Sequence, residues 1–160
     1  MIEIRSADDP EVLAIARRLI SAHFAAHSTA HDSASSDAIV AALPEPYVPP
    51  RGGLWVAFVD RLGAGCVALR EIDIDTGEVK RMYVDPDMRR NGIARILGKH
   101  VIDRARETGY KRLRLGTLAT MKAAQSLYES LGFKSIPAYR TDEFGHTMFY
   151  ELMLDGDSTS

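Results

Sequence analysis

The chain has 160 residues, of which 46% are hydrophobic and 26% charged, and its formal net charge is −2. This length suits one domain with a single sizeable core, which we place at residues 1–154, followed by a frayed polar tail at 155–160. The charge balance gives no electrostatic reason to expect a nucleic-acid partner. No apolar run approaches membrane-spanning length and the N-terminus has no hydrophobic signal core, so we expect a cytoplasmic protein with no membrane partner.

Apolar spacing and turn residues predict helices and strands that alternate along the chain. In chain order, the predicted elements are a helix over 11–25, a loop over 27–36, a helix over 36–43, a linker over 44–53, strands over 54–59, 64–72 and 78–84, a helix from Ile93 to Gly109, a strand over 112–117, a helix over 121–131 and strands over 133–136 and 146–154. The linker holds four of the seven prolines, which disfavours regular structure. The early strands form an antiparallel meander that helices then interrupt, so the fold class is mixed α/β.

A cationic turn from Met88 to Arg95 lies where a predicted strand gives way to a predicted helix. Asp85-Pro86-Asp87 ends the strand, because proline removes a ladder donor and disfavours helix in the residue before it. Free backbone N–H groups and the positive end of the helix dipole favour an anion there. Two neighbouring arginines favour a phosphorylated ligand, so the turn predicts a phosphate-bearing cofactor.

Two short patterns give this turn a more specific meaning. The turn itself reads Arg89-x-x-Gly92-x-Ala94, and Ala124-x-x-Leu127-Tyr128-Glu129-x-x-Gly132-Phe133 follows after a helix and a strand. In this order they resemble the GNAT superfamily of N-acetyltransferases, whose patterns are Gln/Arg-x-x-Gly-x-Gly/Ala and Ala-x-x-Leu-Tyr-x-x-x-Gly-Phe. The resemblance runs from about Leu54 to the last strand.

The resemblance implies the family's acyltransferase fold and direct transfer of an acetyl group from acetyl-CoA to an amine in a ternary complex. It also implies a V-shaped split between the strand at Met82 and the strand at Leu115, in which the pantetheine arm of the cofactor pairs with strand backbone. The residues that it assigns to the cofactor are Met82, Tyr83, Val84, Arg89, Arg90, Asn91, Gly92, Ile93 and Ala94.

Tyr128 matches the family position of the group that meets the departing sulfur. A phenol has a pKa of about 10 and a thiol of about 8.5, so full proton donation is uphill by about 2 kcal/mol and a hydrogen bond to the thiolate is the more favourable role. The structural alternative is that Tyr128 is a core residue of an amphipathic helix.

Glu78, eleven residues before Arg89, lies at the spacing of a general-base glutamate in some family members. At pH 7 an amine with a pKa of about 10.4 is neutral in roughly 1 molecule in 2,500, a cost of about 4.6 kcal/mol. A base, a water relay or a site that lowers the amine pKa would offset that cost. The alternative for Glu78 is an exposed carboxylate at the end of a strand.

Other candidate side chains receive structural interpretations. Cys66 is the only cysteine and is predicted to pack in the core. Met121 replaces an asparagine that contacts pantetheine in many relatives, so it is given no polar role. His23, His27 and His31 are spaced four apart, but no carboxylate or cysteine motif completes a ligand set, and we predict no metal.

The alternative to an enzyme is a module that senses acetyl-CoA without turnover. Tyr128 favours the enzyme, because only turnover needs it; another acyl donor is a third reading. The acceptor pocket is expected from the first helices, the linker and the segment 139–146, which follow no general code. A small-molecule amine and a peptide amine both stay open as acceptors, as does a homodimer.

Overall fold

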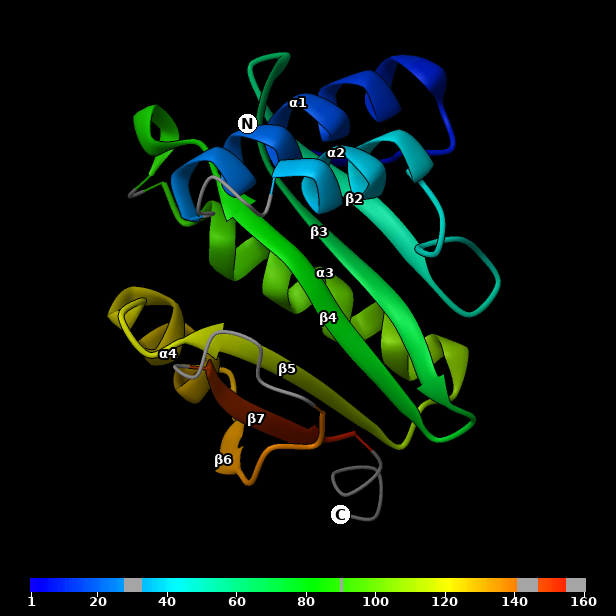
Figure 1. Ribbon diagram of the computed structural model, residues 1–160, viewed down its shortest axis with the longest axis vertical. Helices are drawn as coiled ribbons and strands as arrows, with labels where there is room; N and C mark the ends of the chain where they lie inside the picture. The colour runs from blue at the N-terminus through cyan, green and yellow to red at the C-terminus, as the bar shows by residue number, and fades with distance from the viewer. Residues whose placement is uncertain (28–32, 90, 141–146, 155–160) are drawn as a thin grey trace.

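The computed structural model describes residues 1–27, 33–89, 91–140 and 147–154, which form a seven-stranded sheet with helices on both faces (Figure 1). The strand order is β1-β2-β3-β4-β5-β7-β6. The elements are β1 (Ile2–Ser6), α1 (Pro10–His27), α2 (Ser33–Ala42), β2 (Gly53–Val59), β3 (Leu62–Asp73), β4 (Thr76–Val84), the 3₁₀ turn η2 (Pro86–Met88), α3 (Ile93–Thr108), β5 (Arg112–Leu118), α4 (Lys122–Ser130), β6 (Lys134–Ile136) and β7 (Thr147–Met153). The mixed α/β class is confirmed. The expected tail at 155–160 lies outside the described residues.

Each face of the sheet carries its own apolar cluster. Figure 1 shows α1 and α2 on the near face and α3 on the far face. On the near face, Val12 and Leu19 of α1 pack with Cys66 of β3, and all three are at most 1% exposed. On the far face, Leu97 of α3 packs with Leu115 of β5, again at most 1% exposed. Helical spacing of apolar residues therefore buries one stripe of each helix against the sheet.

Every predicted helix and strand is present, but the sequence analysis missed β1. This strand pairs antiparallel with β2 at the edge of the sheet. Ile2 and Ile4 alternate with polar neighbours, which is the pattern of a half-buried strand, but the run is only five residues long. The predicted hairpin is confirmed: Asp60 and Arg61 both have positive φ, as a tight turn between antiparallel strands demands.

The predicted split between β4 and β5 is also confirmed. These two strands are parallel, and their pairing covers only Thr76↔Arg112, Gly77↔Leu113 and Glu78↔Arg114. β4 nevertheless continues to Val84 and β5 to Leu118. Figure 1 shows the strands close together where they pair and separating toward their arrowheads.

Cys66 provides a simple check of this packing. Its side chain is 0% exposed, its Sγ donates to the carbonyl oxygen of Arg81 at 3.2 Å, and burial raises its pKa to about 12. The cysteine thiolate is the form that attacks the disulfide of a reagent such as DTNB. We therefore expect Cys66 in the native protein at pH 8 to react at least about a hundredfold more slowly than in the chain unfolded in guanidinium. The unfolded chain should release one equivalent of thionitrobenzoate per molecule of protein. Rapid reaction of the native protein would show that β3 is not buried as described.

Candidate active site

A β-bulge in β4 shapes the site next to the split. Ala68 of β3 pairs with Lys80 and Cys66 pairs with Tyr83, so two residues of β4, Arg81 and Met82, lie opposite one residue of β3. Arg81 has φ +58°, a left-handed conformation that is uncommon for residues other than glycine.

The bulge places two consecutive basic side chains on one face of the sheet. Lys80 and Arg81 both line the cavity beside α2, whereas Val79 and Met82 pack with the apolar cluster on the α3 face. The Arg81 Nε donates to the hydroxyl of Tyr47 at 3.0 Å, which helps to hold the strained residue in place.

Glu78 lies at the last position of β4 that pairs with β5, and it is 0% exposed. Its Oε1 accepts from Nε of Arg70 at 2.7 Å. Its Oε2 accepts from the Tyr139 hydroxyl at 2.6 Å and from Nε of Arg140 at 3.2 Å. The alternative of an exposed strand-end carboxylate is therefore wrong: Glu78 is the buried centre of a network that joins three parts of the chain.

Burial and charge act in opposite directions on Glu78. Burial alone would raise the pKa of its carboxyl, but the hydrogen bond from Tyr139 and the positive charges of Lys80 and Arg70 hold this pKa below its usual range. Burial and the Glu78 hydrogen bond raise the pKa of Tyr139, which therefore stays a hydrogen-bond donor. Glu78 is a carboxylate at neutral pH.

The pKa of Lys80 is also shifted, and here burial is the dominant cause. Burial lowers the pKa of its ammonium to about 8, because the positive charges of Arg81, Arg140 and Arg70 add to desolvation and outweigh the attraction of Glu78. Lys80 makes no ion pair or hydrogen bond with any residue in the described part of the chain.

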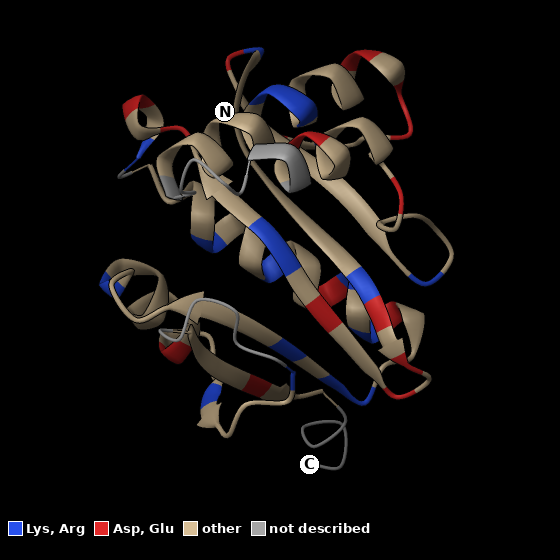
Figure 2. Ribbon diagram, viewed as in Figure 1, with Lys and Arg blue, Asp and Glu red and all other residues tan. Residues whose placement is uncertain are grey.

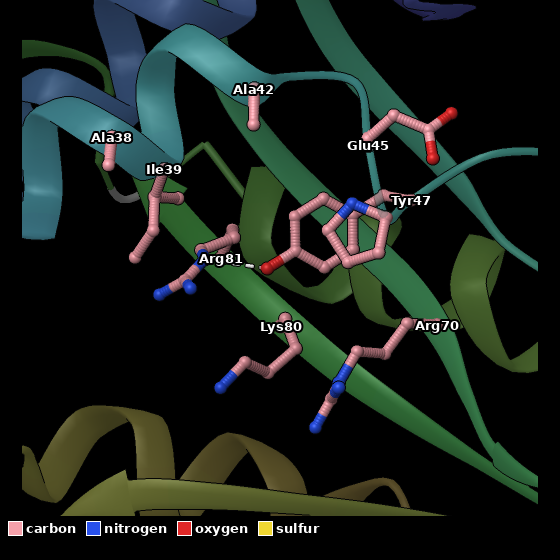
Figure 3. A pocket seen from close by; sticks show the side chains of 9 residues that line it. Ala38, Ile39, Ala42, Glu45, Tyr47, Arg70, Lys80 and Arg81 are labelled. Carbon is pink, nitrogen blue, oxygen red and sulfur yellow. Dashed lines mark hydrogen bonds between the residues drawn. The ribbon is translucent and has the colours of Figure 1, made fainter.

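A cavity of about 400 Å³ opens above these strands (Figure 3). Its lining residues come from α2, the linker and the adjacent strands: Ala38, Ile39, Ala42, Glu45, Pro46, Tyr47, Arg70, Lys80 and Arg81. Figure 2 shows a basic segment in the middle of β4 on this face. The first helical segments and the proline-rich linker were expected to build an acceptor pocket, and α2 and the linker do line this cavity.

Tyr128 lies on α4, beyond β5. It is 5% exposed and meets the Phe133 ring edge-on, with ring centroids 5.6 Å apart. Burial raises the pKa of its phenol, and its hydroxyl has no hydrogen-bond partner within the described residues. Gln125 fixes α4 against the end of β5, because its Nε2 donates to the carbonyl oxygens of Leu118 and Ala119 at 3.0 and 2.9 Å. Tyr128 thus packs in the core while its hydroxyl keeps its donor capacity.

The turn after β4 is ordered by local hydrogen bonds. The Asp85 side chain accepts from the backbone of Asp87, Nε of Arg89 donates to the carbonyl oxygen of Val84 at 3.2 Å, and Nδ2 of Asn91 donates to that of Met88 at 3.0 Å. Arg90 lies outside the described residues.

Gly92 precedes α3 with φ +74°, a left-handed conformation that favours glycine on steric grounds, and a Cβ there would meet nothing within 4 Å. Ile93 is 2% exposed and Ala94 packs against the α3 cluster, so both anchor the helix start. No side-chain hydrogen bond caps α3 at Gly92, so the N–H groups of its first turn have no capping side chain there.

The histidines of the N-terminal region do not complete a metal site among the described residues. No group of three or more His, Cys, Asp and Glu side chains there lies in a position to hold a metal ion. His23 stacks edge-on against Tyr83 at 5.5 Å, and His31 lies outside the described residues. No described helix is both long and apolar enough to cross a membrane.

Comparison with known proteins identifies the class. Residues 15–133 match the model of the acetyltransferase (GNAT) family, and the chain belongs to that family. It is 39% identical over 87 residues to the uncharacterised N-acetyltransferase YsnE of Bacillus subtilis, a match that covers 53% of this chain and 58% of that protein. It is 44% identical over 91 residues to human N-acetylaspartate synthetase, covering 56% of this chain and 30% of that protein.

The fold extends the likeness to nearly the whole chain. The structure of yncA from Salmonella typhimurium with its cofactor acetyl-CoA has a TM-score of 0.74 and 26% identity, covering 96% of this chain and 94% of that one. The curated relatives are matched over less than two thirds of their own length, 58% for the Bacillus protein and 30% for the human one.

The Glu78 network predicts a stability change. Replacing one partner of a buried ion pair costs roughly 3–5 kcal/mol, and because Arg70 and Arg140 are 38% and 34% exposed we expect about 2 kcal/mol for Glu78→Gln at pH 7. Since the folded-state pKa of Glu78 is lowered, its contribution is present above the unfolded pKa near 4.5 and is lost as pH falls further. The difference between variant and parent should therefore shrink in denaturant titrations at pH 4 and below.

Glu107→Gln is the matched control, because Glu107 forms an ion pair with Arg104 in which both side chains are at least 50% exposed. It should change the free energy of unfolding by less than about 0.5 kcal/mol. Equal stability of Glu78→Gln and the parent at pH 7 would contradict the network.

Proposed function

We propose that this protein transfers the acetyl group of acetyl-CoA to an amine by direct attack in a ternary complex. The neutral amine nitrogen forms a bond to the thioester carbonyl carbon and becomes positively charged. The carbon–sulfur bond then breaks, the CoA thiolate leaves, and the nitrogen loses a proton to give the amide. The observation that carries this proposal is the early end of β4–β5 pairing, followed directly by the uncapped N-terminus of α3. Family membership and the acetyl-CoA of the Salmonella structure support it.

The donor would bind largely to backbone. Beyond Glu78, the edge of β4 that faces β5 has no strand partner among the described residues. Its N–H and C=O groups need partners, and the amide-rich pantetheine arm supplies them at Met82, Tyr83 and Val84. The pyrophosphate would then reach the turn at Arg89, Arg90, Asn91, Gly92, Ile93 and Ala94, where the N–H groups and dipole of α3 favour an anion.

Tyr128 would stabilise the leaving thiolate. Its hydroxyl has no partner in the described part of the chain, and its raised pKa keeps the phenol protonated. The same raised pKa makes complete proton transfer to sulfur less favourable than in water. We therefore assign it a hydrogen bond to the developing thiolate rather than full acid catalysis.

The general-base role of Glu78 stays a prediction from the family resemblance. Both carboxylate oxygens accept hydrogen bonds and the pKa lies below its usual range, so Glu78 would be a weak base. The contacts favour a second role, in which Glu78 positions Arg70 and Arg140. In an acetyl-CoA-sensing module, the runner-up, the positions of Tyr128 and Glu78 would serve packing alone. One domain at 1–154 and a cytoplasmic location likewise stay predictions.

Gly92→Val should weaken acetyl-CoA binding by about tenfold or more, because a β-branched residue resists φ +74° and the turn would move its N–H groups away from the phosphates. Calorimetric titration with acetyl-CoA measures this. The matched control is Gly109→Val, which imposes similar strain at φ +101° at the other end of the same helix. If the two variants bound acetyl-CoA with equal affinity, the turn at Gly92 would not belong to the donor site.

Tyr128→Phe should lower kcat by about tenfold to a hundredfold and leave acetyl-CoA affinity within about twofold, because a hydrogen bond to a charged group contributes roughly 1.5–3 kcal/mol. Steady-state assays of CoA release measure both. Tyr110→Phe is the control: it removes a buried hydroxyl that donates to the carbonyl oxygen of Arg51, and should change stability but not kcat. Unchanged turnover in Tyr128→Phe would show that Tyr128 serves only as a packing residue of the core.

Glu78→Gln distinguishes the two roles of Glu78. As the base, Glu78 would impose an acidic limb on the pH dependence of kcat that the variant lacks. As a positioning residue, its loss would raise KM for the acceptor and leave the limb in place. A variant with unchanged KM and an unchanged limb would exclude both roles.

A further inference from the structure

The cavity beside α2 is positively charged where it approaches the donor path. Arg70, Lys80 and Arg81 supply three basic side chains, and among the described residues of its lining Glu45 alone is acidic. Figure 3 shows the Lys80 and Arg70 side chains extending in the same direction, away from α2, while the Glu45 carboxylate points away from them. The Glu78 carboxylate beneath is already held by Arg70 and Arg140.

Donor capacity in this cluster is left unused by the protein itself. Arg70 donates to Glu78 through its Nε, and Arg81 donates to Tyr47 through its Nε. The terminal guanidinium nitrogens of both arginines therefore have no hydrogen-bond partner among the described residues. Lys80 is half-buried, and no described residue pairs with it. Half-buried cations without partners are costly and call for an anion.

Arg81 adds an independent indication. The left-handed conformation of a non-glycine residue costs roughly 1–2 kcal/mol, and it is this conformation that places Arg81 beside Lys80. The Arg81 guanidinium lies 5.1 Å from the Phe24 ring centroid and 5.9 Å from that of Tyr47, so aromatic contacts hold it at the cavity. Backbone strain retained next to a cavity points to a binding role.

We propose that the acceptor is a small amine that carries a carboxylate, and that Arg70, Lys80 and Arg81 bind this carboxylate. The inference rests on the proposed acetyltransferase activity and names its substrate class. The cavity volume of about 400 Å³ lies at the small end of the roughly 300–1,000 Å³ range of ligand pockets, which suits an amino-acid-sized molecule. A polycationic acceptor would meet like charge and be rejected.

The same charges ease loss of the amine proton. A positive environment disfavours an ammonium ion and lowers its pKa, so an acceptor whose carboxylate anchors it here becomes a better nucleophile. Deprotonating a lysine-like amine at pH 7 costs about 4.6 kcal/mol. The positive charges of the pocket would offset part of such a cost. A weakly basic Glu78 is compatible with this arrangement.

The test compares acceptors that have or lack a carboxylate, in steady-state assays of CoA release: L-alanine against L-alaninamide, and glycine against glycinamide, with spermidine as a cationic acceptor. We expect kcat/KM to be at least about tenfold higher for each acid than for its amide, because hydrogen bonds to charged groups contribute roughly 1.5–3 kcal/mol. The amide lowers the pKa of its own amine, so amine availability alone would favour the amide.

Two variants assign the preference to the pocket. Lys80→Met removes the charge at similar volume, and Arg81→Asn removes it with a residue that tolerates positive φ. Each should lower the acid-to-amide ratio about tenfold and leave KM for acetyl-CoA within about twofold. Lys134→Met, at an exposed strand lysine of β6, is the matched control and should change neither value.

Proton uptake gives a second readout. Burial and the charges of Arg81, Arg140 and Arg70 lower the pKa of Lys80 to about 8 against the opposing effect of Glu78. A bound carboxylate would raise this pKa, so binding of L-aspartate to CoA-saturated enzyme at pH 8 should take up as much as about half a proton. Calorimetry in buffers of different ionisation enthalpy measures this uptake, which Lys80→Met should abolish.

The outcomes separate the two proposals. Failure to bind acetyl-CoA would overturn the proposed function itself. If acetyl-CoA binds, then equal use of acids and amides, preference for spermidine, or neither binding nor turnover of the acids would overturn the acceptor inference and leave the proposed donor site standing.

Discussion

The Glu78 carboxylate stabilises the sheet at the point where β4 and β5 separate. Only three residue pairs join these strands, and Glu78 belongs to the last of them. Arg70 approaches this carboxylate from β3, and Tyr139 and Arg140 approach it from beyond β6, so side chains bridge the two halves of the sheet where ladder hydrogen bonds stop. The strands are thus free to diverge without breaking the sheet. The proposed donor path depends on that divergence.

The bulge at Arg81 changes which side chains of β4 lie on each face of the sheet. Before it, side chains alternate between the faces; at it, Lys80 and Arg81 share the face of α2. The edge of the same segment that faces β5 stays unpaired. This short segment therefore has unpaired backbone groups on one edge and cations on one face, so the proposed donor and the proposed acceptor would meet at the same few residues of the strand.

Much of the fold, including the strand-to-helix turn that carries the proposed donor site, could be predicted from the sequence, because these elements depend on local rules. Apolar spacing defined the helices, and Gly92 marked the start of α3 because its backbone needs positive φ. The acceptor side could not be predicted. The contacts of Glu78 with Tyr139 and Arg140 join residues 61 and 62 positions apart. No sequence signal places an arginine in a left-handed bulge, and only the fold decides that Glu78 is buried.

The contrast between the donor side and the acceptor side follows from the chemistry that each would require. Phosphate and pantetheine bind backbone N–H and C=O groups, so many side chains are compatible with the donor path and only the glycine is constrained. An amine acceptor must instead be held and deprotonated, which depends on charges placed to within a few ångströms. Here Glu78 is hydrogen-bonded on both oxygens, and so is a poor proton acceptor, while the cations around it disfavour an ammonium ion. Net positive charge at the acceptor therefore does part of the work that a general base would do, and it does so only for an amine whose own negative charge brings it there.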